Sequence, residues 1–402
     1  MAAAGPLTGV RVLELGSFIA GPFAGQLLGD YGADVIKVEP PGTGDPMRQW
    51  GITRDGESLW WPAIARNKRS VAIDLRDRRG RDVVGRLIDN VDVLLENFRP
   101  GRLDEWGMDY TTLSARNPRV IVTHVSGFGQ TGPRAGEAGF GSIGEAVGGI
   151  RFTTGNPESR PSRAGISLGD SLAAMFAVIG TMAALNERNN SGRGQEVDVA
   201  IYEAVAALME STMADYEIAG RMRTRSGSVL EGVAPSNVYP TADGADIILA
   251  ANADAVFRRL CVAMGRPELA EFEDYATHGA RGRNMAALDA DIAAWTSGYG
   301  TRQLLDILAA NGVPAGEIFT AANMLSDEHY AAREMVVRRT NKSGVSVPMT
   351  GIVPKFSRTP GDVHHVGPRL GEHTALVLSE VAGIDATEQA TMTAAGVIAV
   401  AD

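Results

Sequence analysis

The first 125 residues of the chain alternate short segments rich in Val, Ile and Leu with segments of helical length. The apolar segments predict five strands, at 10–15, 34–38, 70–75, 91–96 and 120–125. Between them, residues 21–31 and 79–90 have the length of helices. Strands that alternate with helices form βαβ units, whose strands run parallel and whose right-handed crossovers place helices on both faces. The sequence therefore predicts an α/β fold around an open, doubly wound parallel sheet.

The rest of the chain predicts further parts, because 402 residues exceed what one ordinary hydrophobic core serves. Residues 127–169 are rich in Gly, Pro and Ser and predict irregular loops that shape a site. Apolar periodicity then predicts helices at 170–186 and 197–216, and a small α+β unit with elements at 246–251, 254–264, 301–311 and 313–319. We expect a large Rossmann-like domain over 1–205, a linker over 206–228, a small α+β domain over 229–325, and an extended return to the large domain over 326–402.

Charge and cysteine content limit the partners. The formal net charge is −10 at pH 7, and binding to nucleic acid or to an anionic membrane needs a basic surface, so we expect neither. Because Cys261 is the single cysteine, an intramolecular disulfide is excluded, which fits a reducing compartment. We expect its side chain to be buried and to serve packing. Residues 1–6 lack the features of a secretion signal, and the apolar segment 171–185 is too short to span a membrane. We therefore expect a cytoplasmic protein.

Two segments match the glycine fingerprint of dinucleotide-binding proteins, Gly127–Gly132 and Gly139–Gly144. That fingerprint requires a strand before it and a helix that opens at the third glycine and faces the pyrophosphate. Gly132 is followed by Pro133, and the second segment lacks a preceding strand and a ribose-binding acid. We expect no NAD. Because no Cys, His and acidic residues have metal-ligand spacing, we also expect no metal.

Residues Gly165–Gly169 match the G-x-S-x-G pattern of serine hydrolases, with Ser167 as the candidate nucleophile. A nucleophile elbow needs a buried strand immediately before it, whereas two arginines and a proline precede this one, at 160, 161 and 163. Histidines follow at 278, 329 and 373, so a serine hydrolase stays open as an alternative.

Asp170 begins the apolar helix that follows. A carboxylate at this position is most often an N-cap, which accepts amide hydrogen bonds and is worth about 1 kcal/mol. The same geometry keeps a carboxylate ionised and directed outward, so that it can attack a thioester. Nearby, Arg151, Arg160 and Arg163 are either solvent-facing charges or a bidentate clamp for a substrate carboxylate. The residues alone do not decide whether Asp170 is a helix cap or a nucleophile. Nor do they decide whether the three arginines are surface charges or a clamp.

Ten short motifs occur in order along nearly the whole chain: Leu7–Leu13, Gly21–Pro22, Gly32–Glu39, Gly44–Asp45, Asn67–Ser70, Glu96–Gly101, Gly127–Pro133, Gly169–Asp170, Gly192–Gln195 and Gly371–Thr374. In these motifs the chain resembles the family III coenzyme A transferases, which include formyl-CoA transferase and the carnitine CoA-transferases, and the related α-methylacyl-CoA racemases. The resemblance implies a Rossmann-like large domain built from both chain ends and a small inserted domain. It also implies an interlocked homodimer, with a related second subunit as a possible partner.

The resemblance further implies the site residues. Asp170 takes the position of the nucleophile, which forms first an aspartyl anhydride and then an aspartyl-CoA thioester. Residues implied to bind CoA or acyl-CoA are Ser17, Phe18, Ile19, Ala20, Ile73, Arg76, Asn97, Phe98, Arg99 and Arg102. Residues implied to contact the acid substrate are Gly141, Arg151, Arg163 and Gly232.

At several positions the sequence differs from particular members of the family, and these differences argue against some substrates and reactions. Ser17, Ile19 and Pro40 stand where formyl-CoA transferase has His, Gln and Arg, which argues against oxalate or formate as substrates. Residues 138–142 lack the His-Asp pair of the racemases, which act by proton transfer. The segments 139–146 and 165–172 look most like members that use succinyl-CoA and a second dicarboxylate. We therefore expect CoA transfer from succinyl-CoA to a dicarboxylic acid, with α-methylacyl-CoA racemase or other acyl-CoA chemistry as the alternative.

Overall fold

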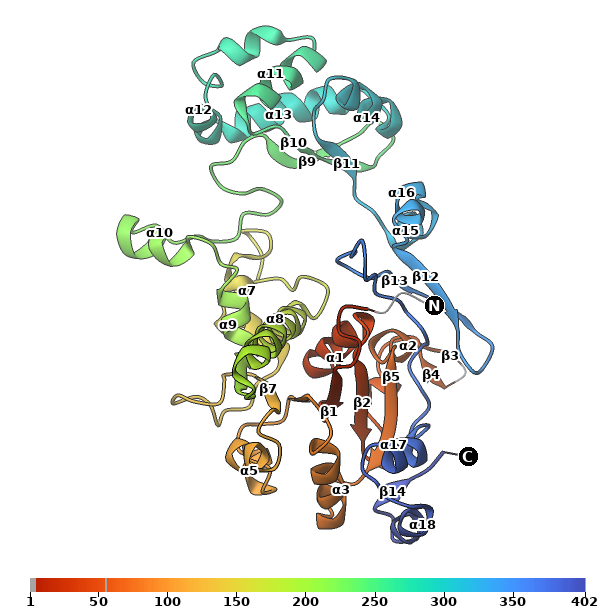
Figure 1. The fold of residues 1–402 in the computed structure, drawn as a ribbon. Helices are drawn as coiled ribbons and strands as arrows, with labels where there is room; N and C mark the ends of the chain where they lie inside the picture. The colour runs from red at the N-terminus through yellow and green to blue at the C-terminus, as the bar shows by residue number, and fades with distance from the viewer. Residues whose placement is uncertain (1–4, 55, 402) are drawn as a thin grey trace. The chain divides into compact units, whose positions relative to one another are not determined.

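The computed structural model describes residues 5–54 and 56–401 (Figure 1). These residues form two compact units. The sheet unit comprises the chain up to Ile150, Ala164–Ala214 and the chain from Glu328 onward, and the inserted unit comprises Arg151–Arg163 and Asp215–Asp327.

The sheet unit is built on seven strands in the order β14-β5-β2-β1-β6-β7-β8. All pair in parallel except β14, which runs antiparallel to β5. Their bounds are β1 Arg11–Glu14, β2 Asp34–Glu39, β5 Lys68–Ile73, β6 Val93–Glu96, β7 Ile121–Ser126, β8 Glu196–Ala200 and β14 Ile398–Ala399. The five strands predicted from the sequence are present, and the central sheet is predominantly parallel, as predicted.

Successive strand residues point to opposite faces, so each strand supplies two hydrophobic cores. Val12 packs beneath α1 (Ala20–Asp30), α8 (Leu168–Ser191) and α9 (Ile201–Ala206). The next residue, Leu13, packs on the other face against α3 (Arg78–Ile88) and the C-terminal helices α17 (Thr374–Glu380) and α18 (Ala386–Ala394). Helices therefore cover both faces of the sheet (Figure 1), as expected for a doubly wound fold.

The prediction of one helix over 197–216 is wrong. The segment begins as strand β8, because Val197 and Val199 alternate with polar residues in the two-residue period of a strand and pair with β7. The chain then forms α9 and, separately, α10 (Thr212–Ala219). The loop region expected at 127–169 also contains two short helices, α6 (Gly141–Val147) and α7 (Ile150–Thr153).

The remaining elements of the sheet unit are short. They are η1 Pro46–Gln49, β3 Thr53–Arg54, β4 Glu57–Ser58, α2 Trp61–Ile64, α4 Arg102–Glu105, α5 Tyr110–Arg116, α16 Glu328–Ala332, β12 Val336–Thr340 and β13 Ser346–Thr350. Strands β12 and β13 form an antiparallel hairpin.

The inserted unit contains a three-stranded antiparallel sheet in the order β11-β10-β9. Its elements are β9 Ser236–Pro240, β10 Asp246–Ala250, α11 Asp254–Ala263, η2 Pro267–Glu271, α12 His278–Arg283, α13 Met285–Thr296, α14 Thr301–Ala310, β11 Ala315–Glu317 and α15 Ala321–Ser326. Strands and helices predicted near 246, 254, 301 and 313 are confirmed. Cys261 is fully buried in this core, and burial raises the pKa of its thiol to about 11, which fits a packing role.

Helix α8 is long and apolar enough, by length and composition, to cross a membrane, but half of its most apolar window is buried. Ala173, Ala177 and Leu185 of this helix lie in the core beneath β1, β6 and β7. The small side chains of Ala173 and Ala177 let α8 pack closely against the sheet and α1. Asp170 lies in the first turn of this helix.

Candidate active site

A cavity of about 630 Å³ opens at the carboxyl ends of the central strands. Strands β2 and β5 lie on one side of β1, and β6 lies on the other, so the winding of the sheet reverses between β1 and β6. Open α/β sheets bind their ligands at such a reversal, outside the carboxyl ends of the strands. The cavity is lined by segments that follow β1, β2, β5 and β6. We call it the switch-point cavity.

Four of the predicted CoA-binding residues line the switch-point cavity, namely Ser17, Ile73, Arg76 and Phe98. The ring of Phe98 meets Trp106 edge to face, at 5.2 Å between centroids. Arg76 is 84% exposed and pairs with Asp74 at 2.9 Å. The two aromatic rings offer apolar surface, and the exposed guanidinium of Arg76 can turn from Asp74 to an anion, which together suit a nucleotide.

Asn97 joins the segments that follow β1 and β6. Its Oδ1 accepts from the backbone N–H of Ser17 at 2.8 Å, and its Nδ2 donates to the carbonyl of Ser17 at 2.8 Å. A side chain at Gly16 would lie 2.7 Å from Asn97 Oδ1, so the missing side chain makes room for this clamp. Phe18 follows with a left-handed φ of 64°. Ile19 and Ala20 are buried at the start of α1.

Arg99 and Arg102 do not line the switch-point cavity. Arg99 donates to the carbonyl of Gly136. Arg102 pairs with Glu105 at 2.6 Å, and its guanidinium lies 5.7 Å from the ring of Trp106, which is a lining residue.

Asp170 is the third residue of α8 and is half-buried. Gly141 opens α6 directly beside it: a Cβ built on Gly141 would lie 2.2 Å from Asp170 Oδ2. The carboxylate thus occupies the space that any side chain at position 141 would need. The structure therefore brings together two residues that the resemblance implied for catalysis and for substrate binding.

The residue before Gly141 links Asp170 to the segment after β1. Phe140 is exposed, and its ring meets Phe18 edge to face at 6.3 Å between centroids. Aromatic side chains therefore lie between the Asn97-clamped segment and the start of α6. These contacts all lie within the sheet unit.

Sequence reasoning missed Glu145, which is buried at 1% exposure. Its Oε1 accepts from the backbone N–H of Gly169 at 3.2 Å, immediately before Asp170. A side chain at Gly169 would lie 2.9 Å from the carbonyl oxygen of Gly141, so the two helices meet backbone to backbone. The available signal was an acidic residue four positions after Gly141, inside a run of small and apolar residues.

The motifs of the rejected alternatives have other roles here. Ser167 is the N-cap residue of α8, and irregular chain rather than a strand precedes it, so the nucleophile elbow of a serine hydrolase is not formed. A Cβ on Gly127 would lie 2.7 Å from Gly139 Cα, so glycines of the two dinucleotide-like motifs serve close packing of the backbone. Within 5–54 and 56–401, no three His, Cys, Asp or Glu side chains cluster as metal ligands.

Three predicted substrate residues belong to the inserted unit. Arg151 lies in α7, Arg163 is exposed in irregular chain, and Gly232 lies in a turn with a φ of 79°.

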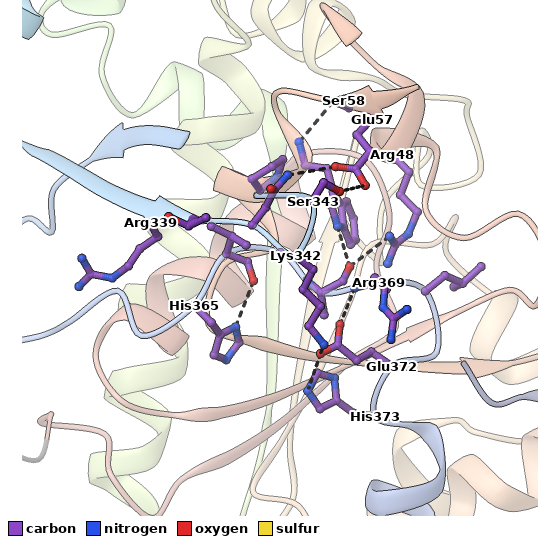
Figure 2. Close-up of a pocket in the computed structure, with 18 of the residues that line it drawn as sticks. Arg48, Glu57, Ser58, Arg339, Lys342, Ser343, His365, Arg369, Glu372 and His373 are labelled. Carbon is purple, nitrogen blue, oxygen red and sulfur yellow. Dashed lines mark hydrogen bonds and ion pairs between the residues drawn. The ribbon is translucent and has the colours of Figure 1, made fainter. Parts of the chain in front are cut away.

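A second cavity, of about 570 Å³, lies between residues 48–62 and the C-terminal segment 339–373 (Figure 2). Its described lining contains none of the predicted site residues. Several of its cationic side chains already have anionic partners: Figure 2 shows Lys342 at Glu372, while Arg339 pairs with Asp362 at 3.2 Å and Arg48 with Glu39 at 2.7 Å. The switch-point cavity is the better candidate for a ligand site because it lies where the winding of the sheet reverses and is lined by four of the predicted CoA-binding residues, whereas the described lining of the second cavity includes none of them.

The chain is similar to known proteins over nearly its whole length. The family model described as CoA-transferase family III matches residues 7–374. The chain is 54% identical over 394 residues to succinyl-CoA–D-citramalate CoA-transferase of Chloroflexus aurantiacus, covering 98% of both chains. It is 39% identical to the β subunit of succinyl-CoA–L-malate CoA-transferase of the same organism, over 94% of this chain and 95% of the relative.

Among solved structures, a CAIB/BAIF family protein from Brucella suis has a TM-score of 0.82 and 36% identity. The match covers 94% of this chain and 100% of the other. Fold, length and sequence thus agree over nearly the whole molecule, and the chain belongs to CoA-transferase family III.

Proposed function

We propose that the protein transfers CoA from succinyl-CoA to a second dicarboxylic acid, with Asp170 as the nucleophile. The observation that carries the proposal is the Asp170 carboxylate at the start of α8, for which Gly141 leaves room. The relative that is 54% identical over 98% of the chain bears the name of a succinyl-CoA–D-citramalate CoA-transferase. A branched hydroxy-dicarboxylate is therefore the first acceptor to test.

The proposed reaction proceeds through covalent intermediates on Asp170. The carboxylate attacks the thioester carbonyl of succinyl-CoA and expels CoA thiolate, which leaves a succinyl-aspartyl anhydride. The thiolate then attacks the aspartyl carbonyl, releases succinate and forms an aspartyl-CoA thioester. The acceptor carboxylate attacks this thioester and expels CoA thiolate, which leaves an acceptor-aspartyl anhydride. The thiolate then attacks the acceptor's carbonyl in this anhydride, which forms the new CoA ester and releases the Asp170 carboxylate. Each step exchanges one acyl bond for another, which divides a difficult exchange into easier ones.

For the cofactor, we propose that the switch-point cavity holds the nucleotide end of CoA. Phe98 and Ile73 offer apolar surface, and Arg76 offers a phosphate partner. The pantetheine arm would follow Ser17–Ala20 toward Phe140 and Asp170. Arg99 and Arg102 would leave their present partners, Gly136 and Glu105, to reach the phosphates.

For the acid substrate, we propose that Arg151 or Arg163 binds the distal carboxylate and that the turn at Gly232 acts as a lid. Bidentate guanidinium pairing distinguishes a dicarboxylate from a monocarboxylate, which has no second acidic group to bind. We also retain, as proposals, the interlocked homodimer, the cytoplasmic location, and the expected large domain over 1–205, linker over 206–228, small domain over 229–325 and return over 326–402.

The function is tested by incubating the protein with succinyl-CoA and single acids: citramalate, malate, glutarate, mesaconate, acetate and butyrate. The expected result is a new CoA ester of a dicarboxylate, with succinate released in equal amount. Epimerisation of a 2-methylacyl-CoA without any exchange of acids would instead support the racemase alternative. Hydrolysis of succinyl-CoA without a new ester would also contradict the proposal.

The clamp is tested by Arg151→Ala and Arg163→Ala. We expect one of them to raise the KM for the dicarboxylate by roughly 10- to 100-fold, the usual cost of a lost charge-assisted hydrogen-bond pair. The KM for a slow monocarboxylate acceptor should stay nearly constant. Arg302→Ala, at a side chain that is 90% exposed on α14, is the matched control. An equal rise in the KM for dicarboxylates and for monocarboxylates would contradict a role of Arg151 and Arg163 in binding the distal carboxylate.

A further inference from the structure

A network of buried charged side chains lies beneath the segment that follows β1. Lys37 in β2 is 1% exposed, and its ammonium group is 2.8 Å from Glu14 Oε1 and 2.8 Å from Asp45 Oδ2. The second oxygen of Glu14 pairs with Lys68 at 2.8 Å. These residues belong to the motifs Gly32–Glu39, Gly44–Asp45 and Asn67–Ser70, or lie at the end of β1. Asp45 also lines the switch-point cavity, but no catalytic or positioning role has been given to any of them above.

The network holds particular backbone groups of residues 16–18. Lys37 Nζ donates to the carbonyl of Gly16 at 2.8 Å, and Asp45 Oδ1 accepts from the N–H of Phe18 at 3.2 Å. Asn97 holds both backbone groups of Ser17 between them. Three side chains thus bind four consecutive polar groups of the backbone. These hydrogen bonds fix the backbone conformation of residues 16–18. A non-glycine residue such as Phe18 keeps a positive φ only where its surroundings hold it in this way.

Both charged residues remain ionised in this setting. Burial alone lowers the pKa of Lys37, but the carboxylates of Glu14, Asp45 and Glu39 outweigh it and raise the pKa overall. Burial alone raises the pKa of Asp45, whereas the charge and hydrogen bond of Lys37 and the amides of Met47 and Phe18 lower it overall. Both hydrogen bonds are therefore charge-assisted, and the one from Lys37 to the Gly16 carbonyl, at 2.8 Å, is the shorter.

We propose that Lys37 and Asp45 are positioning residues for CoA transfer, which hold Gly16–Phe18 so that Phe18 lies against Phe140 beside Gly141 and Asp170. The inference rests on the proposed function and adds a role for these two residues. Neither side chain touches the reacting atoms. Each acts through the backbone of the segment along which the thioester arm of CoA is proposed to lie.

The key comparison is Asp45→Ala against Asp30→Asn. Asp30 is equally buried and pairs with Arg66 at 2.7 Å, but it does not bond to residues 16–18. In Asp45→Ala we expect kcat to fall at least about tenfold and the dissociation constant of CoA to change less than about threefold, because positioning acts on the reacting geometry. In Asp30→Asn, kcat per folded molecule should stay within about twofold of the wild-type value.

Two further variants keep the test decisive. Asp45→Asn retains an oxygen for the N–H of Phe18 and should recover part of kcat, whereas a residue that only balances charge would be impaired equally by Asn and by Ala. If Asp45→Ala does not fold, Asp45→Ser replaces it, because serine still caps η1, where Asp45 accepts from Met47 N–H. Equal kcat in the Asp45 and Asp30 variants, or no difference between Asn and Ala at position 45, would overturn the proposal.

Hydrogen exchange separates this inference from the proposed function. In Asp45→Ala and Lys37→Met, the amides of Ser17 and Phe18 should exchange faster, while those of β1 keep their protection. Unchanged exchange at Ser17 and Phe18 would overturn the inference even in an active enzyme. Wild-type protein that exchanges no CoA would instead overturn the proposed function and, with it, the kinetic role of Lys37 and Asp45.

Discussion

At the scale of single residues, the contact between Asp170 and Gly141 sets the tightest geometric condition in the molecule's candidate site. The carboxylate fills the space of a missing side chain, since a Cβ at position 141 would approach Asp170 Oδ2 to 2.2 Å. Gly141 does not have a positive φ, so alanine fits its backbone without strain. A substitution there therefore displaces the carboxylate specifically.

We predict that Gly141→Ala lowers kcat by roughly 100-fold, the effect of about 1 Å of misplacement at a reacting group. The melting temperature should change little, because alanine favours the helix. Gly136→Ala is the matched control, since a Cβ there meets nothing within 4 Å. Wild-type kcat in Gly141→Ala, measured by succinyl-CoA consumption, would contradict the assigned role of Asp170.

Sequence motifs indicated many of these residues without indicating their partners. Asn97 was predicted to contact CoA, and the structure adds that its amide clamps Ser17. Lys37 and Asp45 were only marks of the family, and Glu145 was not noticed. The reason is physical: a motif gives residue types and spacing along the chain, whereas hydrogen-bond partners depend on which strand ends the fold brings together.

At the scale of elements, strands β6 and β7 carry a buried ion pair next to the switch-point cavity. His124 Nδ1 lies 2.5 Å from Glu96 Oε1, and the other oxygen of Glu96 accepts from the N–H of Phe98 at 2.6 Å. Burial alone lowers the pKa of His124, but the hydrogen bonds and charges of Glu96 and Glu196 outweigh it and raise the pKa overall. Glu96 therefore connects the protonation state of His124 to the position of Phe98, which lines the switch-point cavity.

This pair predicts a pH-dependent stability. Because the folded-state pKa of His124 is raised, its stabilisation is fully present below about pH 6.5 and is lost as the pH rises through the folded-state pKa. His124→Gln should lower the free energy of unfolding by about 1–3 kcal/mol at low pH and by less at high pH. Urea unfolding of both proteins between pH 5.5 and 8.5 gives the difference. A pH-independent difference would contradict the assignment.

The elements themselves were largely predictable where hydrophobic periodicity is long. Strands β1, β2, β5, β6 and β7 and helices α1, α3 and α8 follow from the apolar patterns of their segments. Strand β8 was missed because its five residues precede α9 without a break, so strand and helix periods merge in one window. Short helices such as α6 depend on packing against α8 and α9 rather than on their own sequence.

For the whole molecule, the proposed interlocked homodimer depends on contacts between two chains rather than on any single residue or element. One chain has a mass of 42.4 kDa. We predict a particle of twice that mass by light scattering. Tagged and untagged dimers, mixed after purification, should not exchange subunits, because interlocked chains separate only on unfolding. A monomer, or rapid exchange, would contradict this architecture.

A second related subunit is the alternative assembly, since one relative is itself named a β subunit. No periodicity or motif encodes an assembly, because it depends on surfaces of two chains at once. An active dimer of this chain alone would exclude the need for such a partner. A folded dimer without activity would favour it.

The proposed reaction depends on the acylation of Asp170 during CoA transfer. The purified protein would be incubated with succinyl-CoA, quenched, digested and analysed by mass spectrometry for adducts in the peptide around residues 165–188, with Asp170→Ala and Ser167→Ala as controls. We expect a succinyl or CoA adduct on Asp170 that persists in Ser167→Ala and disappears in Asp170→Ala, together with a new CoA ester when an acceptor is added. An adduct on Ser167 instead, or exchange of CoA that persists in Asp170→Ala, would contradict it.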